Sequence, residues 1–149
     1  MNQIVRTTPD NIDFKRLIEL LDIDIQERDG DEHVFYAQFN KTDSIKNAVV
    51  VYVDEVAVGC GAFKLYQDEV AEIKRMYVDP KMRGKGIASK ILIELENWAR
   101  EEGYTSAILE TGHKFPEAVA LYQKNGFVIT ENYGQYIGVA DSICFQKNL

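Results

Sequence analysis

The sequence predicts a mixed α/β or α+β fold in which helices cover one central sheet. Three observations support this class. Segments rich in β-branched residues alternate along the chain with segments whose apolar residues recur at helical spacing. Glycine and proline residues separate these segments. The length of 149 residues, 46% of them apolar, suffices for a domain with its own core, so we expect residues 1–149 to form a single domain.

The N-terminal part begins with an expected short strand at residues 4–7. The Thr-Pro-Asp run at residues 8–10 is a helix-start signal. Behind it, four apolar residues recur at the spacing of one helical face, namely Phe14, Leu17, Ile18 and Leu21. Residues 24–46 are polar and irregular in pattern, and no element is assigned to them.

The middle of the chain predicts a hairpin. Two β-rich runs at residues 48–53 and 56–66 flank an acidic pair at 54–55. Gly59 and Gly61 alternate inside the second run. Because glycine weakens a strand, its presence there predicts either a bulge or a close approach by backbone or ligand.

The remaining elements follow from similar signals. Pro80 ends a strand because proline has no N–H for a strand ladder. Gly103 ends a long amphipathic helix, and Pro116 suits the first turn of another. The expected elements are a strand at 69–78, a helix at 84–102, a strand at 106–110, a helix at 116–125, and strands at 127–130 and 137–146. The resulting order, βα–βββ–α–β–α–ββ, places helices between strands of one sheet.

Composition and charge exclude several classes of function. A net charge of −7 without a basic cluster argues against a nucleic-acid partner. No apolar run approaches the roughly 20 residues of a membrane span, and residues 1–6 lack the apolar stretch of a secretion signal. We therefore expect a cytoplasmic protein with no membrane partner, in which Cys60 and Cys144 are reduced and buried. His33 and His113 have no second ligand at zinc-like spacing, so no metal site is predicted.

The turn at residues 82–89, Met-Arg-Gly-Lys-Gly-Ile-Ala-Ser, joins an expected strand to an expected helix. Its glycines permit positive φ angles and a close approach of backbone to ligand. The first amides of a helix lack intrahelical acceptors and carry the positive end of the helix dipole. Arg83 and Lys85 add positive charge, so the turn predicts a phosphate-binding site.

Two well-known phosphate motifs do not match this turn. A P-loop fails because Asp79 occupies the leading glycine position and Gly86 follows Lys85. A dinucleotide fingerprint fails because Ser89 replaces the third glycine, and because the preceding strands form hairpins rather than a βαβ unit.

The turn instead contains an Arg-x-x-Gly-x-Ala motif at Arg83, Gly86 and Ala88. It is accompanied by Glu-Ile-Lys-Arg-Met-Tyr-Val-Asp-Pro at 72–80, Leu-Glu-Thr-Gly at 109–112 and Leu-Tyr-Gln-Lys-Asn-Gly-Phe at 121–127. This ensemble resembles the GCN5-related N-acetyltransferase (GNAT) superfamily, with a motif core over about residues 50–130. The resemblance implies one acetyltransferase domain with a mostly antiparallel mixed sheet of about seven strands. It also implies helices on both faces and a splayed parallel strand pair.

The resemblance implies acetyl-CoA as co-substrate. Backbone amides of the turn would grip the diphosphate, and pantetheine would pair with the backbone of Met76 and Val78. The Met76 amide would polarise the thioester carbonyl. Phe115 stands where many members have an asparagine that bonds pantetheine, so that contact is in doubt. The implied cofactor-binding residues are Met76, Tyr77, Val78, Arg83, Gly84, Lys85, Gly86, Ile87, Ala88 and Ser89.

Two side chains are candidates for catalysis. Tyr122 matches the family tyrosine that protonates the departing thiolate, and the alternative is an amphipathic tyrosine at the edge of the core. Glu72 is the candidate base that deprotonates the amine, and the alternative is a carboxylate paired with Lys74 or Arg75. Strict alternation would place Glu72, Lys74, Met76 and Val78 on one face of the strand, unless a bulge intervenes. Glu110, on the adjacent strand, is a second base candidate.

The acceptor site has several candidate groups. Phe35, Tyr36 and Phe39 either line an acceptor pocket or cap the core. Acidic residues at 29–32 either attract a cationic acceptor or form a solvated loop. In a fold of this kind the turn at 132–136 faces the acceptor cleft. The candidate acceptor residues are therefore Phe35, Tyr36, Glu110, Tyr133, Gln135 and Tyr136.

The resemblance thus implies direct transfer of an acetyl group from acetyl-CoA to the primary amine of a small molecule. A covalent relay through Cys144 lacks an apparent partner base. One alternative is acetylation of proteins or peptides. Another is a non-catalytic acetyl-CoA sensor, which needs the turn but neither Tyr122 nor Glu72. The resemblance also leaves a homodimer open.

Overall fold

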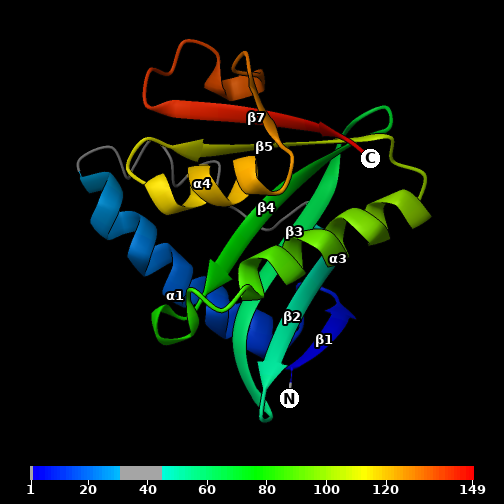
Figure 1. Ribbon diagram of the computed structural model, residues 1–149, viewed down its shortest axis with the longest axis vertical. Helices are drawn as coiled ribbons and strands as arrows, with labels where there is room; N and C mark the ends of the chain where they lie inside the picture. The colour runs from blue at the N-terminus through cyan, green and yellow to red at the C-terminus, as the bar shows by residue number, and fades with distance from the viewer. Residues whose placement is uncertain (1, 31–44) are drawn as a thin grey trace.

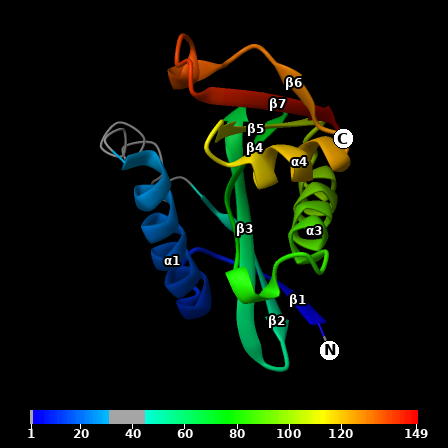
Figure 2. The same ribbon diagram turned by 60° about the vertical axis from the view of Figure 1, so that its left-hand side comes forward.

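The computed structural model describes residues 2–30 and 45–149. Its elements are β1 (Asn2–Thr7), α1 (Ile12–Asp29), β2 (Asn47–Val53), β3 (Val56–Gln67), β4 (Val70–Val78), a 3-10 turn η2 (Pro80–Met82), α3 (Ile87–Glu101), β5 (Ser106–Gly112), α4 (Pro116–Lys124), β6 (Val128–Thr130), a 3-10 turn η3 (Gly134–Tyr136) and β7 (Ser142–Asn148). The strands form one sheet of seven in the order β1-β2-β3-β4-β5-β7-β6. Helix α1 covers one face, and α3 and α4 cover the other (Figures 1 and 2). The predicted fold class is confirmed.

Helix α1 begins where the sequence predicts and continues further. The Asn11 side chain accepts a hydrogen bond from the Phe14 amide at 2.9 Å and so caps the first turn. The helix runs on to Asp29, although residues from 24 onward were expected to be irregular. That expectation is wrong because apolar periodicity is not the only support for a helix. An i,i+4 ion pair between Asp24 and Arg28 at 3.2 Å supports the last turns.

The β2–β3 hairpin has its turn at 54–55, where both residues have positive φ angles of 49° and 69°. The two glycines of β3 face α3. A Cβ atom built on Gly61 would lie 2.6 Å from Met76 Sδ and 2.7 Å from Ile91 Cγ2. The glycines therefore serve a close approach of neighbouring side chains to the β3 backbone, one of the two explanations that the sequence offers.

A β-bulge interrupts β4 opposite Gly61. Cys60 pairs with Tyr77, whereas Ala62 pairs with Lys74, so Arg75 and Met76 lie opposite the single residue Gly61 and β4 has one extra residue at this point. Arg75 has a φ of 63°. A bulge bends a strand and re-aims the side chains that follow it.

The bulge changes which side chains share a face. Ile73, Met76 and Val78 all pack in the core below α3. Alternation therefore places Glu72 on the opposite face, which α1 covers. The expectation that Glu72 and Lys74 share a face with Met76 and Val78 is wrong, because Arg75 resets the alternation. The Arg75 side chain also faces α1, where Nη2 donates a hydrogen bond to Asp22 Oδ1 at 2.8 Å.

Strands β4 and β5 form the parallel pair, and they pair only at their beginnings. The pairs run from Val70–Ser106 to Glu72–Ile108. Beyond them the strands diverge, as Figure 1 shows. Over residues 73–78 the β4 edge that faces β5 therefore has no strand partner, which confirms the predicted splay.

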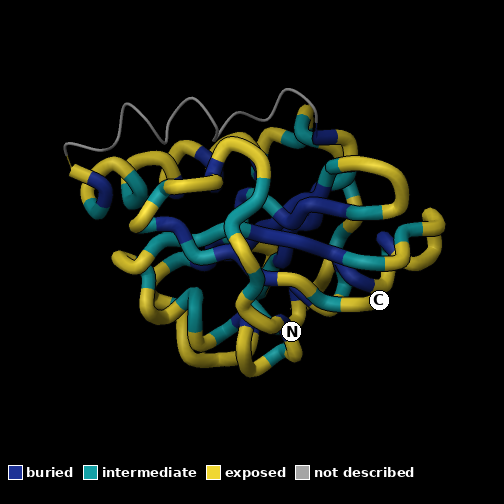
Figure 3. The backbone as a smooth tube through the Cα atoms, turned by 90° about the horizontal axis from the view of Figure 1, so that it is seen from above, coloured by how far each residue is buried: buried dark blue, intermediate teal, exposed yellow. Residues whose placement is uncertain are grey.

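The core lies in two layers, one on each face of the sheet. The layer below α3 contains Phe63, Leu95 and Phe145, and the layer below α1 contains Phe14 and Leu17. In Figure 3 the buried segments of the chain, in dark blue, run through the middle of the molecule, and exposed segments surround them. Each layer contributes apolar burial at roughly 25 cal/mol per Å². Packing on both faces thereby holds the sheet rigid, including the two strands that diverge.

The last strand begins later than predicted. Strand β7 starts at Ser142, so the expected strand at 137–146 is wrong over its first five residues. The Asn132 side chain donates from Nδ2 to the carbonyl oxygens of Tyr136 and Val139 at 3.0 and 3.1 Å. Because these carbonyls are already satisfied within the loop, the segment does not join the sheet.

Candidate functional site

A cleft of about 410 Å³ opens where β4 and β5 diverge. Its walls come from the end of β4, the turn that follows η2, the start of α3, one side of α4, and Leu21 and Asp24 of α1. Both walls carry apolar groups, and the glycine-rich turn lies at one end. Side chains and backbone that line it include Met76, Val78, Gly86, Ala88, Leu121 and Tyr122.

The turn at the start of α3 presents unsatisfied amides. Gly84 and Gly86 have φ angles of 78° and 81°, so helix α3 begins at Ile87, later than the predicted start. The Lys90 amide bonds the Gly86 carbonyl at 3.1 Å, which leaves the amides of residues 87–89 without an intrahelical acceptor. No side chain caps this helix end. The helix dipole and these donors together suit an anion.

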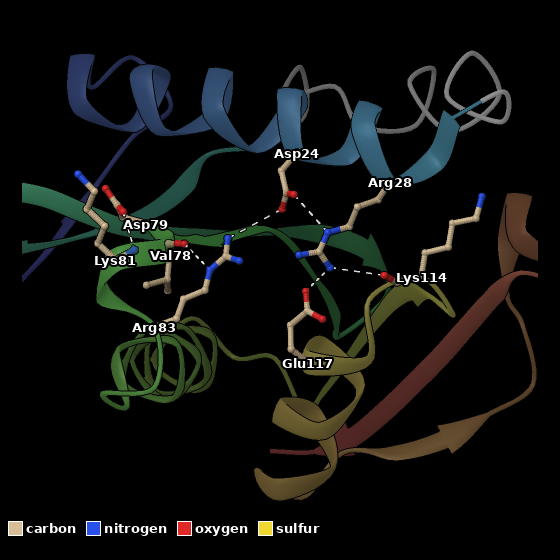
Figure 4. A network of polar contacts seen from close by, with 8 residues as sticks. All are labelled: Asp24, Arg28, Val78, Asp79, Lys81, Arg83, Lys114 and Glu117. Carbon is tan, nitrogen blue, oxygen red and sulfur yellow. Dashed lines mark hydrogen bonds and ion pairs between the residues drawn. The ribbon is translucent and has the colours of Figure 1, made fainter.

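Arg83 lies beside this turn but is directed toward β4 and α1. Its Nε donates a hydrogen bond to the Val78 carbonyl at 2.8 Å, and its Nη2 lies 3.9 Å from Asp24 Oδ2 (Figure 4). The guanidinium is therefore partly neutralised by a carboxylate from α1. Its charge still lies at the mouth of the cleft, as the sequence predicts.

A polar network links α1 to α4 next to the cleft (Figure 4). The Arg28 guanidinium binds Asp24 on its own helix and Glu117 on α4. It also lies over the Phe115 ring, 4.7 Å from the ring centroid. Asp24 and Arg28 were not predicted as site residues, because the apolar pattern of their segment indicates no helix. Their i,i+4 spacing is the signal that would have placed them on a helix.

All of the predicted cofactor-binding residues except Lys85 line this cleft. Lys85 is exposed and is not among the lining residues. Ser89 lines the cleft and also accepts a hydrogen bond from Asn125 Nδ2 at 3.1 Å, which ties the first turn of α3 to the end of α4. Phe115, at the position where many related proteins have asparagine, lines the cleft with its ring.

A second cavity of about 150 Å³ adjoins the cleft through the gap between β4 and β5. Met76, Phe115 and Tyr122 line both spaces. Glu72 and Glu110 also line the second cavity. The residues on which the chemistry would depend therefore meet at one junction.

Tyr122 lies at this junction with its ring buried. The ring packs against Phe127 and Phe145, with centroids 6.0 and 5.8 Å away. Its hydroxyl makes no hydrogen bond to any residue that the structure describes. Burial, followed by the negative charge of Glu110, raises the pKa of Tyr122 well above its ordinary value. The phenol is therefore protonated at neutral pH and available as a donor.

Glu72 is only 4% exposed and accepts a hydrogen bond from the Tyr133 hydroxyl at 2.7 Å, on Oε2. The same carboxylate raises the pKa of Tyr133, after burial, which is the largest cause. Tyr133 belongs to the turn that the sequence predicts to face the acceptor. This bond therefore fastens that turn to β4.

Glu110 accepts a hydrogen bond from the Ser142 hydroxyl at 2.7 Å, on Oε2. Burial raises the pKa of Glu110 to about 7, while the Ser142 bond and the Lys74 charge act in the opposite direction. A carboxylate with a pKa near neutrality suits a general base. The sequence contains no signal for this shift because it arises from packing.

The other acceptor candidates are distributed differently. Tyr136 is buried and lines the second cavity, whereas Gln135 is exposed and does not. Asp29, expected in an acidic surface, is only 5% exposed and lines this cavity. The remaining candidates lie outside the described residues, namely Asp31, Glu32, Phe35, Tyr36 and Phe39.

Within residues 2–30 and 45–149, no group of three or more histidine, cysteine, aspartate or glutamate residues is placed to hold a metal ion. None of the helices in the described part of the chain is both long and apolar enough to cross a bilayer.

The splayed strand pair, the amide-rich helix start and the junction at Tyr122 together define an acetyltransferase-type fold. The chain belongs to the acetyltransferase (GNAT) family, whose model matches residues 14–127. This confirms the resemblance drawn from the motifs.

Three relatives illustrate the match. The "IAA acetyltransferase" of Azospirillum brasilense is 39% identical over 80 residues, which are 53% of this chain and 52% of that protein. The chain spans about half the length of the first curated relatives that it matches. A Klebsiella pneumoniae crystal structure, named as an acyl-CoA N-acyltransferase, is 30% identical with a TM-score of 0.83 and covers 100% of this chain and 98% of that one. A GNAT acetyltransferase of Elizabethkingia anophelis with acetyl-CoA bound shares the fold at 20% identity and a TM-score of 0.73, covering 99% and 98% of the two chains.

Proposed function

We propose that this protein transfers an acetyl group from acetyl-CoA to the primary amine of a small molecule. One observation carries the proposal: the gap between β4 and β5 connects an anion-binding helix start to a cavity that holds Tyr122 and two carboxylates. Membership of the GNAT family supports the same reaction.

The cleft suits acetyl-CoA in three ways. The amides at the start of α3 would bind the diphosphate. The unpaired β4 edge over residues 73–78 would offer backbone hydrogen bonds to pantetheine, which contains amide groups of its own. The apolar walls at Met76, Val78 and Leu121 would cover its methylene groups. A protein of the same fold is named as binding acetyl-CoA.

Transfer would be direct. Both cysteines are buried, and burial raises the pKa of Cys60 to about 12 and that of Cys144 to about 11. Neither thiol therefore supplies a thiolate at neutral pH for a covalent acetyl intermediate. The amine would attack the thioester itself, and Tyr122 would give its proton to the departing sulfur.

A small acceptor suits the second cavity, whose volume of about 150 Å³ is lined by described residues of α1, β4, β5, α4 and η3. Peptide or protein acceptors need a longer open groove. We propose a cytoplasmic location as well, which suits two cysteines that form no disulfide.

Two measurements test the proposal. Calorimetry with acetyl-CoA should show binding. If no heat of binding is detected even at millimolar acetyl-CoA, the cofactor assignment is refuted. Release of free thiol from acetyl-CoA should then depend on an added amine. A panel of small primary amines should surpass a matched panel of peptides, and the reverse ranking would point to a protein substrate. Binding without any amine-dependent release would identify a sensor.

A further inference from the structure

We propose that Glu110 is the general base of this site, and that Glu72 positions the acceptor turn through Tyr133. This inference rests on the proposed acetyl transfer. It reverses the order of the two candidates that the sequence suggests, and it is drawn from where each carboxylate lies and what it contacts.

Glu110 lies where β5 has separated from β4. The last pair between these strands is Glu72–Ile108, so Glu110 is two residues beyond it, beside the open gap. The other edge of β5 pairs with β7, and Glu110 is the partner of Cys144 there. The carboxylate is therefore mounted on a rigid strand and lines the cavity that Tyr122 shares with the cofactor cleft.

The two carboxylates have different hydroxyl partners. Glu72 accepts from the Tyr133 phenol, and that bond holds a loop against the sheet. Glu110 accepts from Ser142, which lies at the start of the neighbouring strand β7. Loss of the Glu72 bond would release the loop that contains Tyr133 from the sheet. Loss of the Ser142 bond would change only the orientation of the Glu110 carboxylate.

Glu110 is also the carboxylate whose charge affects the pKa of Tyr122, the proposed acid. Burial is the main cause of the raised pKa of Tyr122, and the negative charge of Glu110 raises it further. When Glu110 takes a proton from the ammonium group, this charge disappears. Tyr122 then becomes a stronger acid at the moment when a thiolate needs its proton. The base and the acid would thus be coupled through the gap.

Several ionisable groups face Glu110 from the surrounding elements. Glu72 and Asp29 raise the pKa of Glu110, whereas Lys74 lowers it. The charge of Glu110 in turn raises the pKa values of four neighbours, namely Lys74, Tyr122, Tyr136 and Cys144, and Asp141 lines the same cavity. The facing groups are Glu72 and Lys74 of β4, Asp29 of α1, Tyr122 of α4, Tyr136 of η3, Asp141 before β7, and Cys144 of β7.

The proton balance of the step is complete. The ammonium gives its first proton to Glu110, and the neutral nitrogen then forms its bond to the thioester carbon. The carbon–sulfur bond breaks with its electron pair on sulfur, and Tyr122 protonates that sulfur. The second proton from nitrogen restores the phenol. The products are an amide, a free thiol and one proton, which leaves from Glu110 to solvent.

The test compares Glu110→Gln with Glu72→Gln, a matched change in the same cavity. Each variant is assayed with the best alkylamine from the panel and with its β,β,β-trifluorinated analogue, whose amine is largely neutral at the assay pH. With the alkylamine, Glu110→Gln should lower kcat/KM by about 100-fold or more. With the fluorinated amine the loss should shrink at least tenfold, because no ammonium needs a base. Glu72→Gln should show no such dependence on the amine.

The pH profile provides a second readout. The acid limb of kcat/KM should have an apparent pKa of about 7 in the wild type and should vanish in Glu110→Gln. Ser142→Ala removes a hydrogen bond that favours the ionised carboxylate, so it should move this limb to higher pH. Glu72→Gln should retain the limb.

A measurement without turnover completes the test. Carbon-13 NMR of glutamate carboxyls should show one group titrating near pH 7 that is missing from Glu110→Gln. The role of Glu110 would be overturned if Glu110→Gln lowered kcat/KM equally with both amines, or if the acid limb vanished in Glu72→Gln instead. Either result would leave the acetyl-transfer proposal standing. Failure of the wild type to release thiol with any amine would overturn both.

Discussion

Met76 occupies the space that a side chain at Gly61 would need. The sulfur of Met76 lies 2.6 Å from the Cβ position of that glycine, at the point where β4 bulges. The absence of a side chain on β3 thus allows Met76 to lie beneath α3 while its backbone borders the cleft. Packing in the core and the shape of the cleft are coupled through this pair.

Gly61→Ala should therefore lower the free energy of unfolding by about 1–3 kcal/mol, since it overpacks a site also bounded by Ile91 and Leu95. Urea denaturation measures the change. Gly112→Ala, whose Cβ would come no closer than 3.3 Å to a neighbour, is the control. An unchanged midpoint for Gly61→Ala would show that β3 and α3 are less closely packed than described.

Gly86→Val should weaken acetyl-CoA binding at least tenfold in calorimetry. The cause is not crowding by the protein, because a Cβ at Gly86 meets no atom within 4 Å. It is the φ of 81°, which costs a side-chain-bearing residue about 1–2 kcal/mol and would rotate the helix amides away from the ligand. Gly103→Val imposes similar strain at a φ of 95° beyond the other end of α3, and it should leave the affinity intact. Equal losses in both variants would contradict a binding role for the turn.

Tyr122→Phe should reduce kcat by about 100-fold while the Kd for acetyl-CoA changes less than about threefold. The ring contacts with Phe127 and Phe145 are retained, and the hydroxyl has no partner among the described residues, so stability should be nearly unchanged. Tyr104→Phe, which alters a tyrosine packed on Phe63, serves as the matched control. Wild-type turnover in Tyr122→Phe would remove this phenol from the mechanism.

Glu110→Gln should stabilise the fold at alkaline pH. The pKa of Glu110 is raised to about 7 in the folded protein from 4.5, so the folded state binds the proton more tightly than the unfolded state. Its contribution is fully present below pH 4.5, falls as the pH rises, and is lost above about pH 7. Relative to the wild type, the glutamine variant should gain about 2 kcal/mol between pH 5 and pH 8. Denaturant melts at both pH values would show it, and parallel curves would contradict the raised pKa.

The positions of most strands and helices were predictable because their signals are local. Hairpin turns, helical periodicity and the Pro80 stop each depend on a few neighbouring residues. The exceptions have identifiable causes. The segment 137–141 satisfies its carbonyls through Asn132, and the last turns of α1 depend on ion pairs rather than on an apolar face.

By itself, the sequence determined the order of elements, the glycine turn at the start of α3 and the family. These depend on backbone preferences and on motifs that are contiguous in the chain. Only the tertiary structure supplies the observations on which we propose Glu110 rather than Glu72 as the base. The bulge at Arg75 assigns side chains to faces, and the burial of Glu110 between strands and helices distant in sequence sets its pKa. Electrostatic energies depend on distance in space and on exclusion of water, and neither can be read from spacing along the chain.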